Sequence, residues 1–282
     1  MEFSRIGIIG AGTMGHGIAH VSAMAGDEVV LYDVDEARVS AGLGKIAGNL
    51  AKGVEKGKVS VADRDATLAR IRTTTSLDAL ASCQIIVEAV PEKLALKQDL
   101  FRRLGALVGP GTVLATNTSS LSVATIAEAA PDPTRVIGTH FFNPVHIMTL
   151  LEIVVHEGTA PEILDTVKSW GARMGKETIT VRDFPGFATS RLGVCLGMEA
   201  IRMVEQGVAS AEDIDKAMVL GYRHPVGPLK LTDMVGLDVR LAIGEYLARA
   251  LDNPAFEPPA LMRQMVAEGK LGQKSGFGFY RW

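Results

Sequence analysis

Cysteine is nearly absent from this chain. Among 282 residues there are only two, Cys83 and Cys195. Two thiols are too few for a disulfide framework or a thiolate metal cluster in a chain of this length. We therefore expect both to be small hydrophobic residues in a reducing compartment, and we expect no metal in the functional site.

Excess charge of one sign and long hydrophobic runs are also lacking. The 29 basic and 32 acidic residues leave a formal charge of -3, so no broad positive field is present to hold a nucleic acid. No apolar run reaches the roughly 18 residues of a membrane span. The first ten residues, MEFSRIGIIG, lack the features of a signal or transit peptide. We expect a cytoplasmic enzyme, although a mature organellar protein without its leader would look the same.

The composition that is present belongs to a folded protein. Hydrophobic residues make up 47% and charged residues 22% of the chain, which excludes a disordered chain. The length fits one large domain or two unequal domains.

Up to about residue 183, short β-rich apolar runs alternate with helical stretches. Strands separated by helical stretches pair in parallel, because a parallel crossover is usually a helix. This pattern predicts an α/β doubly wound sheet in residues 1–183. The expected strands are Arg5 to Ile9, Glu28 to Tyr32, Ile85 to Val90, Val113 to Thr116, Val136 to His140, Leu151 to Val155 and Thr178 to Val181.

After residue 183 the strand pattern stops. Apolar residues then recur at spacings of three and four, as in Leu192, Leu196, Ala200 and Met203, which is typical of amphipathic helices. We expect a smaller all-α C-terminal domain in residues 184–282.

A glycine-rich hexapeptide, Gly10-Ala11-Gly12-Thr13-Met14-Gly15, lies between an expected strand and an expected helix. Asp33 ends the next strand, 18 residues beyond Gly15, and this context makes a weak motif specific. Gly10 permits a tight turn, Gly12 permits close approach of a pyrophosphate, and Gly15 permits close packing of helix and strand.

This turn predicts a Rossmann-type site for NAD. The helix N-terminus favours the phosphates, beside Thr13 and Met14. Asp33 accepts hydrogen bonds from the ribose hydroxyls and repels a 2'-phosphate, so we expect NAD rather than NADP. The alternative is a tight turn without a ligand.

Three further motifs carry polar residues: NTSS with Ser119 after one strand, HFFNP with His140 and Asn143 after another, and LLEIV with Glu152. The carboxyl ends of parallel strands form the ligand crevice of an open sheet. We expect Ser119, His140 and Asn143 to gather there.

These residue types suit the oxidation of an alcohol. Hydride transfer needs a base for the hydroxyl proton, and imidazole has a suitable pKa. Glu152 would accept the other imidazole N–H, while Ser119 and Asn143 would contact the substrate oxygen or the nicotinamide amide. A structural histidine and a solvent-facing Glu152 stay open as alternatives. We assign no role to the other histidines, which are His16, His20, His146, His156 and His224.

An ordered set of motifs resembles the 3-hydroxyacyl-CoA dehydrogenase family, in particular its bacterial 3-hydroxybutyryl-CoA branch. The likeness covers nearly the whole chain and comprises GAGTMG, VEAVPE, NTSSL, HFFNP, PGF, DIDKAM, the stretch from HPVGP to GLD, and GQKSGFGFY. The resemblance implies His140 and Glu152 as the catalytic pair, with Ser119 and Asn143 beside them.

The resemblance also implies contacts with the cofactor and with CoA that the motifs alone do not predict. Glu92, Lys97 and Lys274 match cofactor contacts of the family, and Lys56 matches a lysine near the phosphates of CoA. Lys45, Lys52 and Lys56 have the spacing of one helix face, which is also the pattern of an ordinary solvated surface.

Ser190 departs from the family pattern. The family usually has asparagine at this position of PGFxxNR, as a substrate contact, whereas this chain has PGFATSR. A hydroxyl is shorter than an amide, so the placement of the acyl group is less certain.

The resemblance implies reversible oxidation of a (3S)-3-hydroxyacyl-CoA by NAD, with a four-carbon acyl group. The helical domain would close the substrate cleft and form a homodimer. Two alternatives remain: a dehydrogenase of CoA-free hydroxy or sugar acids, as in the gulonate dehydrogenase and λ-crystallin branch, and a catalytically silent NAD-binding protein.

Overall fold

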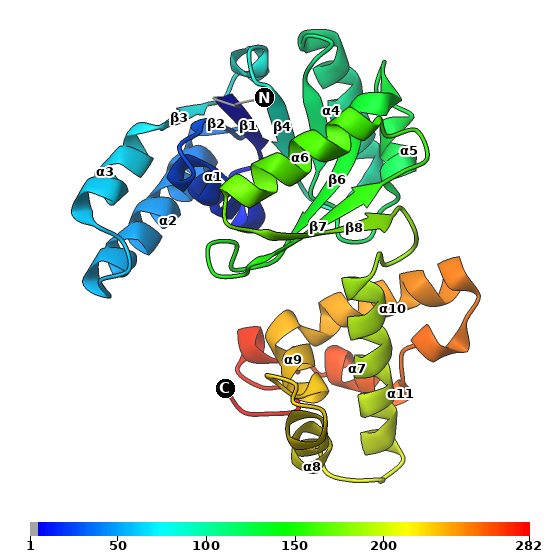
Figure 1. Ribbon diagram of the computed structural model, residues 1–282. Helices are drawn as coiled ribbons and strands as arrows, with labels where there is room; N and C mark the ends of the chain where they lie inside the picture. Colours follow the sequence, from blue (N-terminus) through cyan, green and yellow to red (C-terminus); the bar gives the residue numbers. More distant parts are fainter. Residues whose placement is uncertain (1–4) are drawn as a thin grey trace. The chain divides into compact units, whose positions relative to one another are not determined.

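The computed structural model describes residues 5–282, which form two compact units (Figure 1). Unit 1 ends at Asp183 and unit 2 begins at Phe184.

Unit 1 is built around an eight-stranded sheet. The strands are β1 Arg5–Ile9, β2 Glu28–Tyr32, β3 Ile71–Thr74, β4 Ile85–Glu88, β5 Val113–Thr116, β6 Val136–Phe141, β7 Leu150–Val155 and β8 Glu177–Arg182. Their order is β3-β2-β1-β4-β5-β6-β7-β8, and every neighbouring pair from β3 to β6 is parallel. The predicted doubly wound sheet is confirmed.

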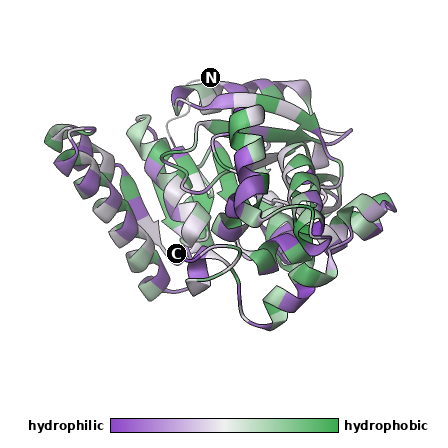
Figure 2. Ribbon diagram, turned by 90° about the horizontal axis from the view of Figure 1, so that it is seen from below, coloured by the Kyte–Doolittle hydropathy of each residue, from purple (hydrophilic) through white to green (hydrophobic). Residues whose placement is uncertain are grey.

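Helices cover both faces of this sheet. They are α1 Thr13–Met24, α2 Glu36–Glu55, α3 Val61–Ala69, α4 Leu94–Leu107, α5 Val123–Ala127 and α6 Pro161–Arg173, with 3-10 turns at Leu77–Leu80 and Pro133–Arg135. Since both faces are covered, β4 and β5 are buried along their full lengths. The helices carry both polar and apolar residues (Figure 2) and direct the apolar ones, such as Ile18, Ile46 and Trp170, into the core.

The last two strands correct the prediction of parallel pairing. β7 runs antiparallel to β6 and places Glu152 directly opposite His140, and β8 is parallel to β7. Only residues 142–149 connect β6 to β7. A parallel crossover needs about a dozen residues or more, so this connection forces the chain to turn back.

Strand β3 is absent from the sequence prediction. It lies at the edge of the sheet and pairs only with β2. Its sequence, IRTT, has one aliphatic residue and an exposed arginine. An edge strand needs no continuous apolar run, so the pattern used to find the other strands does not detect it.

Unit 2 is helical, as predicted. It contains α7 Thr189–Glu205, α8 Ala211–Lys216, a π-helical turn at Ala217–Gly221, α9 Pro228–Val235, α10 Leu237–Leu251 and α11 Ala260–Ala267, with 3-10 turns at Pro254–Phe256 and Gln273–Ser275. Its own core includes Val194, Ile201, Leu229 and Leu247. The buried Asp233 carboxylate accepts hydrogen bonds from the backbone N–H groups of Phe279 and Tyr280, which fastens the C-terminal tail to α9.

Candidate active site

The turn between β1 and α1 has the geometry required for a dinucleotide. Gly10 has φ 98°, and a Cβ there would lie 2.7 Å from the carbonyl oxygen of Ala89. A Cβ on Gly15 would lie 1.6 Å from the carbonyl oxygen of Gly10, whereas a Cβ on Gly12 would meet nothing within 4 Å. Gly10 and Gly15 are thus required by packing. Gly12 instead leaves space beside the N-terminus of α1, where it is the N-cap.

Asp33 is fixed beside this turn. One carboxylate oxygen accepts a hydrogen bond from the backbone N–H of Ala11 at 2.8 Å, and the other accepts one from Val34 at 2.7 Å. Each oxygen has a further lone pair, so the carboxylate can still accept a ribose hydroxyl. The glycine turn and Asp33 therefore fit NAD, and they are the residues that would hold its pyrophosphate and adenosine ribose.

His140 and Glu152 form a buried pair in the middle of adjacent strands. The imidazole Nδ1 lies 2.8 Å from Glu152 Oε2, and the two residues are 7% and 0% exposed. The antiparallel register of β6 and β7 places the two residues opposite each other, so their side chains share one face of the sheet. The solvent-facing alternative for Glu152 is therefore wrong.

A pocket of about 270 Å³ joins this pair to the dinucleotide turn. Its lining includes Met14 from the start of α1, Ser119 after β5, and His140 from β6. Glu92, Asn117 and Phe141 complete its polar and aromatic wall, together with Ala89 and Val90. The structure thus brings Met14, Ser119 and His140 to one pocket, whereas Asn143, which the sequence analysis expected beside Ser119 and His140, is not among its lining residues. Asn143 lies three residues beyond His140 in an exposed turn, where its peptide bond to Pro144 is cis.

Glu92 organises the turn that carries Ser119. Its Oε1 accepts hydrogen bonds from the Thr118 hydroxyl at 2.5 Å and from the Ser119 backbone N–H at 3.0 Å. Burial alone would raise the pKa of Glu92, but the charge of Lys97 and these hydrogen bonds outweigh it and hold the pKa below its usual value. Glu92 is therefore a charged acceptor at the pocket wall.

Lys97 is almost completely buried, with 1% exposure. Its amine lies 2.7 Å from Glu88 and 3.2 Å from Glu92. In this arrangement Lys97 holds Glu92, and Glu92 holds the Ser119 turn. The contact between Lys97 and the cofactor, which the resemblance implied, stays a prediction.

Asn117 is a site residue to which the sequence analysis gave no role. Its side-chain oxygen accepts a hydrogen bond from the backbone N–H of Phe141 at 3.0 Å and thereby ties the end of β5 to β6 beside His140. The sequence feature that could have indicated this role is the position of Asn117 as the first residue of the NTSS motif.

Three further predicted contacts are not among the residues that line this pocket. Lys56 is the C-cap of α2 and lines a second pocket of unit 1. Ser190 lies in the first turn of α7, and the Lys274 amine forms an ion pair with Asp238 at 2.5 Å, both in unit 2. The roles given to these three residues stay predictions.

The fold and the site together define an NAD-dependent oxidoreductase. The chain belongs to the 3-hydroxyacyl-CoA dehydrogenase family: the model of its NAD binding domain matches residues 5–184, and the model of its C-terminal domain matches residues 186–282. The predicted family, the NAD cofactor and the enzyme class are confirmed.

Similar proteins cover the full length of the chain. A 3-hydroxybutyryl-CoA dehydrogenase of Mycobacterium tuberculosis is 42% identical over 280 residues, which are 99% of this chain and 98% of that protein. The crystal structure of M. tuberculosis FadB2 has a TM-score of 0.97 at 41% identity and covers 100% of both chains. That of (S)-3-hydroxybutyryl-CoA dehydrogenase from Ralstonia eutropha has a TM-score of 0.96 at 40% identity, covering 100% of this chain and 99% of that one.

No helix among residues 5–282 combines the length and the apolar character needed to cross a bilayer. Of the two cysteines, Cys83 is buried and Cys195 is half-buried. Burial raises the pKa of the Cys83 thiol to about 11, so this thiol is an unreactive part of the core.

Proposed function

We propose that the chain interconverts (3S)-3-hydroxybutyryl-CoA and acetoacetyl-CoA, with His140 as the general base and Glu152 as its orienting partner. The observation that carries this proposal is the 2.8 Å contact between two buried side chains beside a pocket that also contains Ser119 and Met14. The four-carbon acyl group is supported by the relatives from M. tuberculosis and R. eutropha, whose names specify 3-hydroxybutyryl-CoA.

His140 and Glu152 together determine which ring nitrogen takes the substrate proton. Because Nδ1 contacts Glu152, Nε2 is the ring nitrogen that takes the proton of the substrate hydroxyl. The C–O bond becomes a carbonyl as His140 takes this proton; NAD held at the glycine turn would supply the hydride acceptor for the same carbon. The carboxylate of Glu152 stabilises the imidazolium that forms, and the reverse reaction returns both the proton and the hydride.

Ser119 and Asn143 are the proposed polar contacts of the reacting oxygen or of the nicotinamide amide. Ser119 lines the same pocket as His140, and the Glu92 carboxylate holds its backbone. Glu92, Lys97 and Lys274 are kept as proposed contacts of the cofactor. Lys56 is the proposed contact of the CoA phosphates, because its amine belongs to a cationic pocket of the same unit.

Reduction of a series of 3-ketoacyl-CoA thioesters by NADH tests the activity. We expect acetoacetyl-CoA to give the highest kcat/KM, NADH to be preferred over NADPH by at least about tenfold because of Asp33, and CoA-free acetoacetate to be a poor substrate. Equal turnover of free acetoacetate would favour the CoA-free hydroxy acid dehydrogenase. NADH binding without turnover of any thioester would favour the silent protein.

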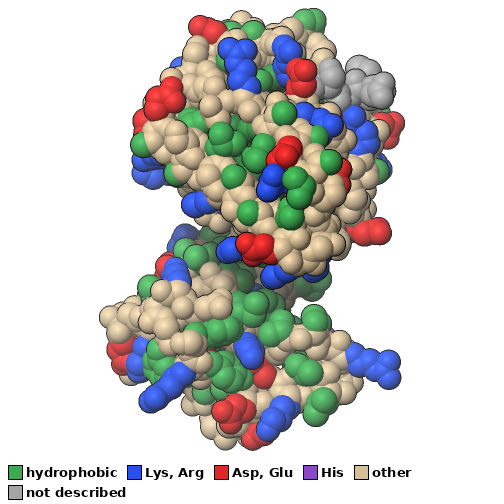
Figure 3. Space-filling model, turned by 90° about the vertical axis from the view of Figure 1, so that its left-hand side faces the viewer, with side chains coloured by type: hydrophobic (Ala, Val, Ile, Leu, Met, Phe, Trp, Pro, Cys, Tyr) green, Lys and Arg blue, Asp and Glu red, His purple; other side chains and the backbone are tan. Residues whose placement is uncertain are grey.

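We also propose a homodimer through unit 2. Large hydrophobic side chains of this unit are exposed, among them Leu192, Leu220, Tyr222 and Met234. Figure 3 shows hydrophobic side chains gathered on one face of the unit, and exposed patches of this kind mark interfaces. Light scattering after size-exclusion chromatography should give twice the chain mass of 30.0 kDa, and a monomer at micromolar concentration would contradict the proposal.

Ser190 is the proposed substrate contact that differs from the family pattern. If the shorter side chain leaves the substrate less well held, Ser190→Asn should raise kcat/KM for acetoacetyl-CoA by a few-fold, on the scale of one hydrogen bond. Unchanged kinetics would remove Ser190 from the substrate contacts.

A further inference from the structure

Glu88 is a buried carboxylate to which the sequence and the proposed function give no role. It is the last residue of β4 and is 0% exposed. One of its oxygens, Oε1, accepts hydrogen bonds from the backbone N–H of Val90 and from the Lys97 amine, both at 2.7 Å. The other, Oε2, accepts hydrogen bonds from the Thr116 hydroxyl at 2.7 Å and from the same amine at 2.9 Å. The carboxylate therefore uses its full capacity to accept hydrogen bonds.

A charged side chain at this position of a strand needs an explanation. β4 is buried along its whole length, and strands of that kind are usually continuous runs of aliphatic residues. A buried ion pair seldom stabilises a fold more than aliphatic side chains of the same volume, because both charges lose their hydration. Since the fold alone gives no reason for Glu88, the reason lies in what its carboxylate holds.

Glu88 holds the amine of Lys97 in one place. Lys97 is 1% exposed, and its amine contacts both oxygens of Glu88 and, at 3.2 Å, Oε2 of Glu92. An ammonium group has three N–H donors, so these three carboxylate oxygens match its capacity. No other lysine or arginine among residues 5–282 forms an ion pair with Glu88 or Glu92. Lys97 thus links a carboxylate at the end of β4 to a carboxylate at the wall of the pocket.

Glu92 continues this chain of contacts to the Ser119 turn. It contacts Lys97 through Oε2, and its Oε1 accepts hydrogen bonds from the Thr118 hydroxyl and the Ser119 backbone N–H. Burial opposes the charged form of Glu92, but the charge of Lys97 and the hydrogen bonds hold its pKa below the usual value. A charged acceptor forms the stronger hydrogen bonds. Because Glu92 and Ser119 line the pocket that contains His140, the geometry of this pocket depends on the position of Lys97.

We propose that Glu88 is a positioning residue that holds the Ser119 turn in place beside His140. Its charge acts through Lys97 and Glu92. The inference rests on the proposed function, in which Ser119 contacts the reacting oxygen or the nicotinamide amide. When the charge of Glu88 is removed, Glu92 is the one of the two carboxylates that remains for the buried amine. The amine then moves toward Glu92 and competes with the Ser119 turn for its oxygens.

Two substitutions separate the charge of Glu88 from its shape. Glu88→Gln keeps the size of the side chain but removes the charge, whereas Glu88→Asp keeps the charge on a shorter side chain. We expect kcat for acetoacetyl-CoA reduction by NADH to fall by about 10²-fold in Glu88→Gln, the scale of a small misplacement in a site. KM for acetoacetyl-CoA should stay within about twofold, and Glu88→Asp should be about tenfold faster than Glu88→Gln. A role in packing alone predicts the opposite order of the two variants.

Hydrogen exchange tests the hold on the Ser119 turn without any assay of activity. The Ser119 backbone N–H donates to Glu92, and it exchanges with solvent more quickly when this hydrogen bond opens more often. We expect residues 117–121 to exchange about tenfold faster in Glu88→Gln than in the wild type, on the scale of one hydrogen bond. Mass spectrometry of peptides from the labelled full-length protein measures this rate.

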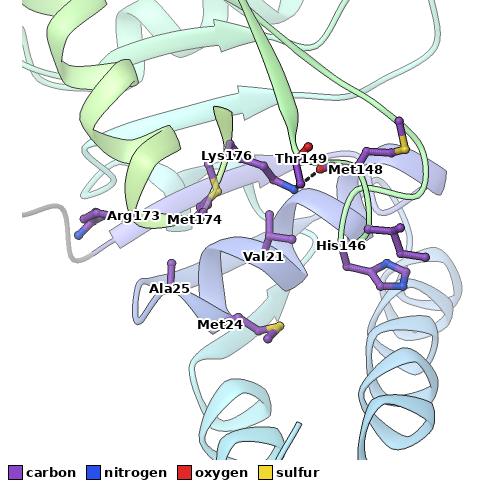
Figure 4. A pocket seen from close by; sticks show the side chains of 11 residues that line it. Val21, Met24, Ala25, His146, Met148, Thr149, Arg173, Met174 and Lys176 are labelled. Atoms are coloured by element: carbon purple, nitrogen blue, oxygen red, sulfur yellow. Dashed lines mark hydrogen bonds between the residues drawn. The ribbon is translucent and has the colours of Figure 1, made fainter. Parts of the chain in front are cut away.

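Asp27→Asn is the matched control. The Asp27 carboxylate is 1% exposed and pairs with Arg173 at 2.5 Å, so this variant also removes the charge of a buried carboxylate that is paired with a cation. Neither residue lines the pocket that contains His140. Arg173 instead lines a different pocket of about 370 Å³ (Figure 4). Asp27→Asn should keep kcat within about twofold of the wild type and leave the exchange of residues 117–121 unchanged.

The double variant Glu88→Gln/Lys97→Met decides the outcome if Glu88→Gln does not fold. It removes both charges of the buried pair, and such replacements are often neutral for stability. Glu92 then lacks its cation, so kcat should again fall by about 10²-fold and residues 117–121 should exchange faster. A double variant with the kcat and the exchange of the wild type would show that Glu88 serves stability alone.

The outcomes separate this inference from the proposed function. If Glu88→Gln keeps the kcat of the wild type while acetoacetyl-CoA is turned over, the inference is wrong and the proposed function stands. If the wild type turns over no thioester, the proposed function fails and the exchange of residues 117–121 decides the rest. Faster exchange in Glu88→Gln but not in Asp27→Asn then supports the hold on the Ser119 turn, and equal exchange in both contradicts it.

Discussion

Two buried histidines of unit 1 have opposite surroundings. His140 contacts a buried carboxylate, Glu152. His20 is buried at least as deeply, but the groups around it are His16, His146 and Lys176. Burial alone therefore does not define what an imidazole does. A histidine beside a carboxylate has a fixed orientation and a partner that stabilises its charged form, whereas neighbouring cations disfavour the charged form.

The two sites also differ in how the chain assembles them. His140 and Glu152 face each other across neighbouring antiparallel strands. His20 and His146 meet because the β6–β7 connection packs on α1. Gly17 permits this packing, since a Cβ there would lie 2.7 Å from the Val145 side chain. The connection that turns β7 around thus serves both sites.

Removal of the imidazole from the first site should have the largest effect. His140→Gln keeps a polar side chain but has no basic nitrogen, so kcat for acetoacetyl-CoA reduction should fall by about 10³- to 10⁴-fold, at the upper end for a positioned acid or base. Steady-state assays with NADH measure this loss. His156→Gln serves as the control, because the ring of His156 contacts the carbonyl oxygen of Pro133, and it should stay within about twofold of the wild type. Activity near that of the wild type in His140→Gln would exclude the proposed mechanism.

Removal of the carboxylate should make His140 more like His20. Glu152→Gln retains size and hydrogen bonding but loses the charge that stabilises the imidazolium, so kcat should fall by about 10²- to 10³-fold, with a much smaller change in KM. A change confined to KM would show that Glu152 acts on binding rather than on proton transfer.

Much of this site was predictable because its residues lie in or directly after strands with strong local patterns. β1, β2 and β5 are apolar runs bounded by turns, and in the glycine turn Gly10 and Gly15 have a steric explanation while Gly12 leaves space for a ligand. The direction of β7 was not predictable in this way, because the pattern of apolar residues in a strand does not indicate whether it runs parallel or antiparallel to its neighbour. It follows instead from the length of the connection after β6.

The proximity of His20 and His146 was harder to predict from the sequence. His20 lies within an apolar helix face, where a histidine is more often structural, and its neighbour His146 is 126 positions away in the numbering. The lysine pattern around Lys56 was visible, but a solvated helix face has the same spacing. Only the packing of the β6–β7 connection on α1 brings the two histidines together.

The acid stability of the protein should show the effect of burying His20 among basic groups. The pKa of His20 is lowered to about 4 in the folded protein, below its ordinary value, so the unfolded chain binds this proton first. The stabilising contribution is present above pH 6.5 and is lost as the pH falls toward 4, and it amounts to about 2 kcal/mol between pH 7 and pH 5. Urea denaturation should show this loss in the wild type.

The variant His20→Gln removes the imidazole that binds this proton, so it tests whether His20 differs from His140 in this way. Its free energy of unfolding should depend less on pH by about 2 kcal/mol between pH 7 and pH 5, while His156→Gln should follow the wild type. An unchanged pH dependence in His20→Gln would show that the pKa of His20 is not lowered in the folded protein.

The smallest effect should come from single lysines of the second pocket of unit 1, which Lys56 lines. Lys56→Gln removes one exposed charge, which should weaken CoA binding by about five- to tenfold at low ionic strength and by less in high salt. Lys45→Gln is the matched control, since Lys45 lies on the same helix but outside the lining of the pocket. Calorimetric titration at two salt concentrations compares them. Equal losses in both variants would mean that CoA senses only the overall charge of α2, whereas a selective loss in Lys56→Gln supports the proposed contact between Lys56 and the CoA phosphates.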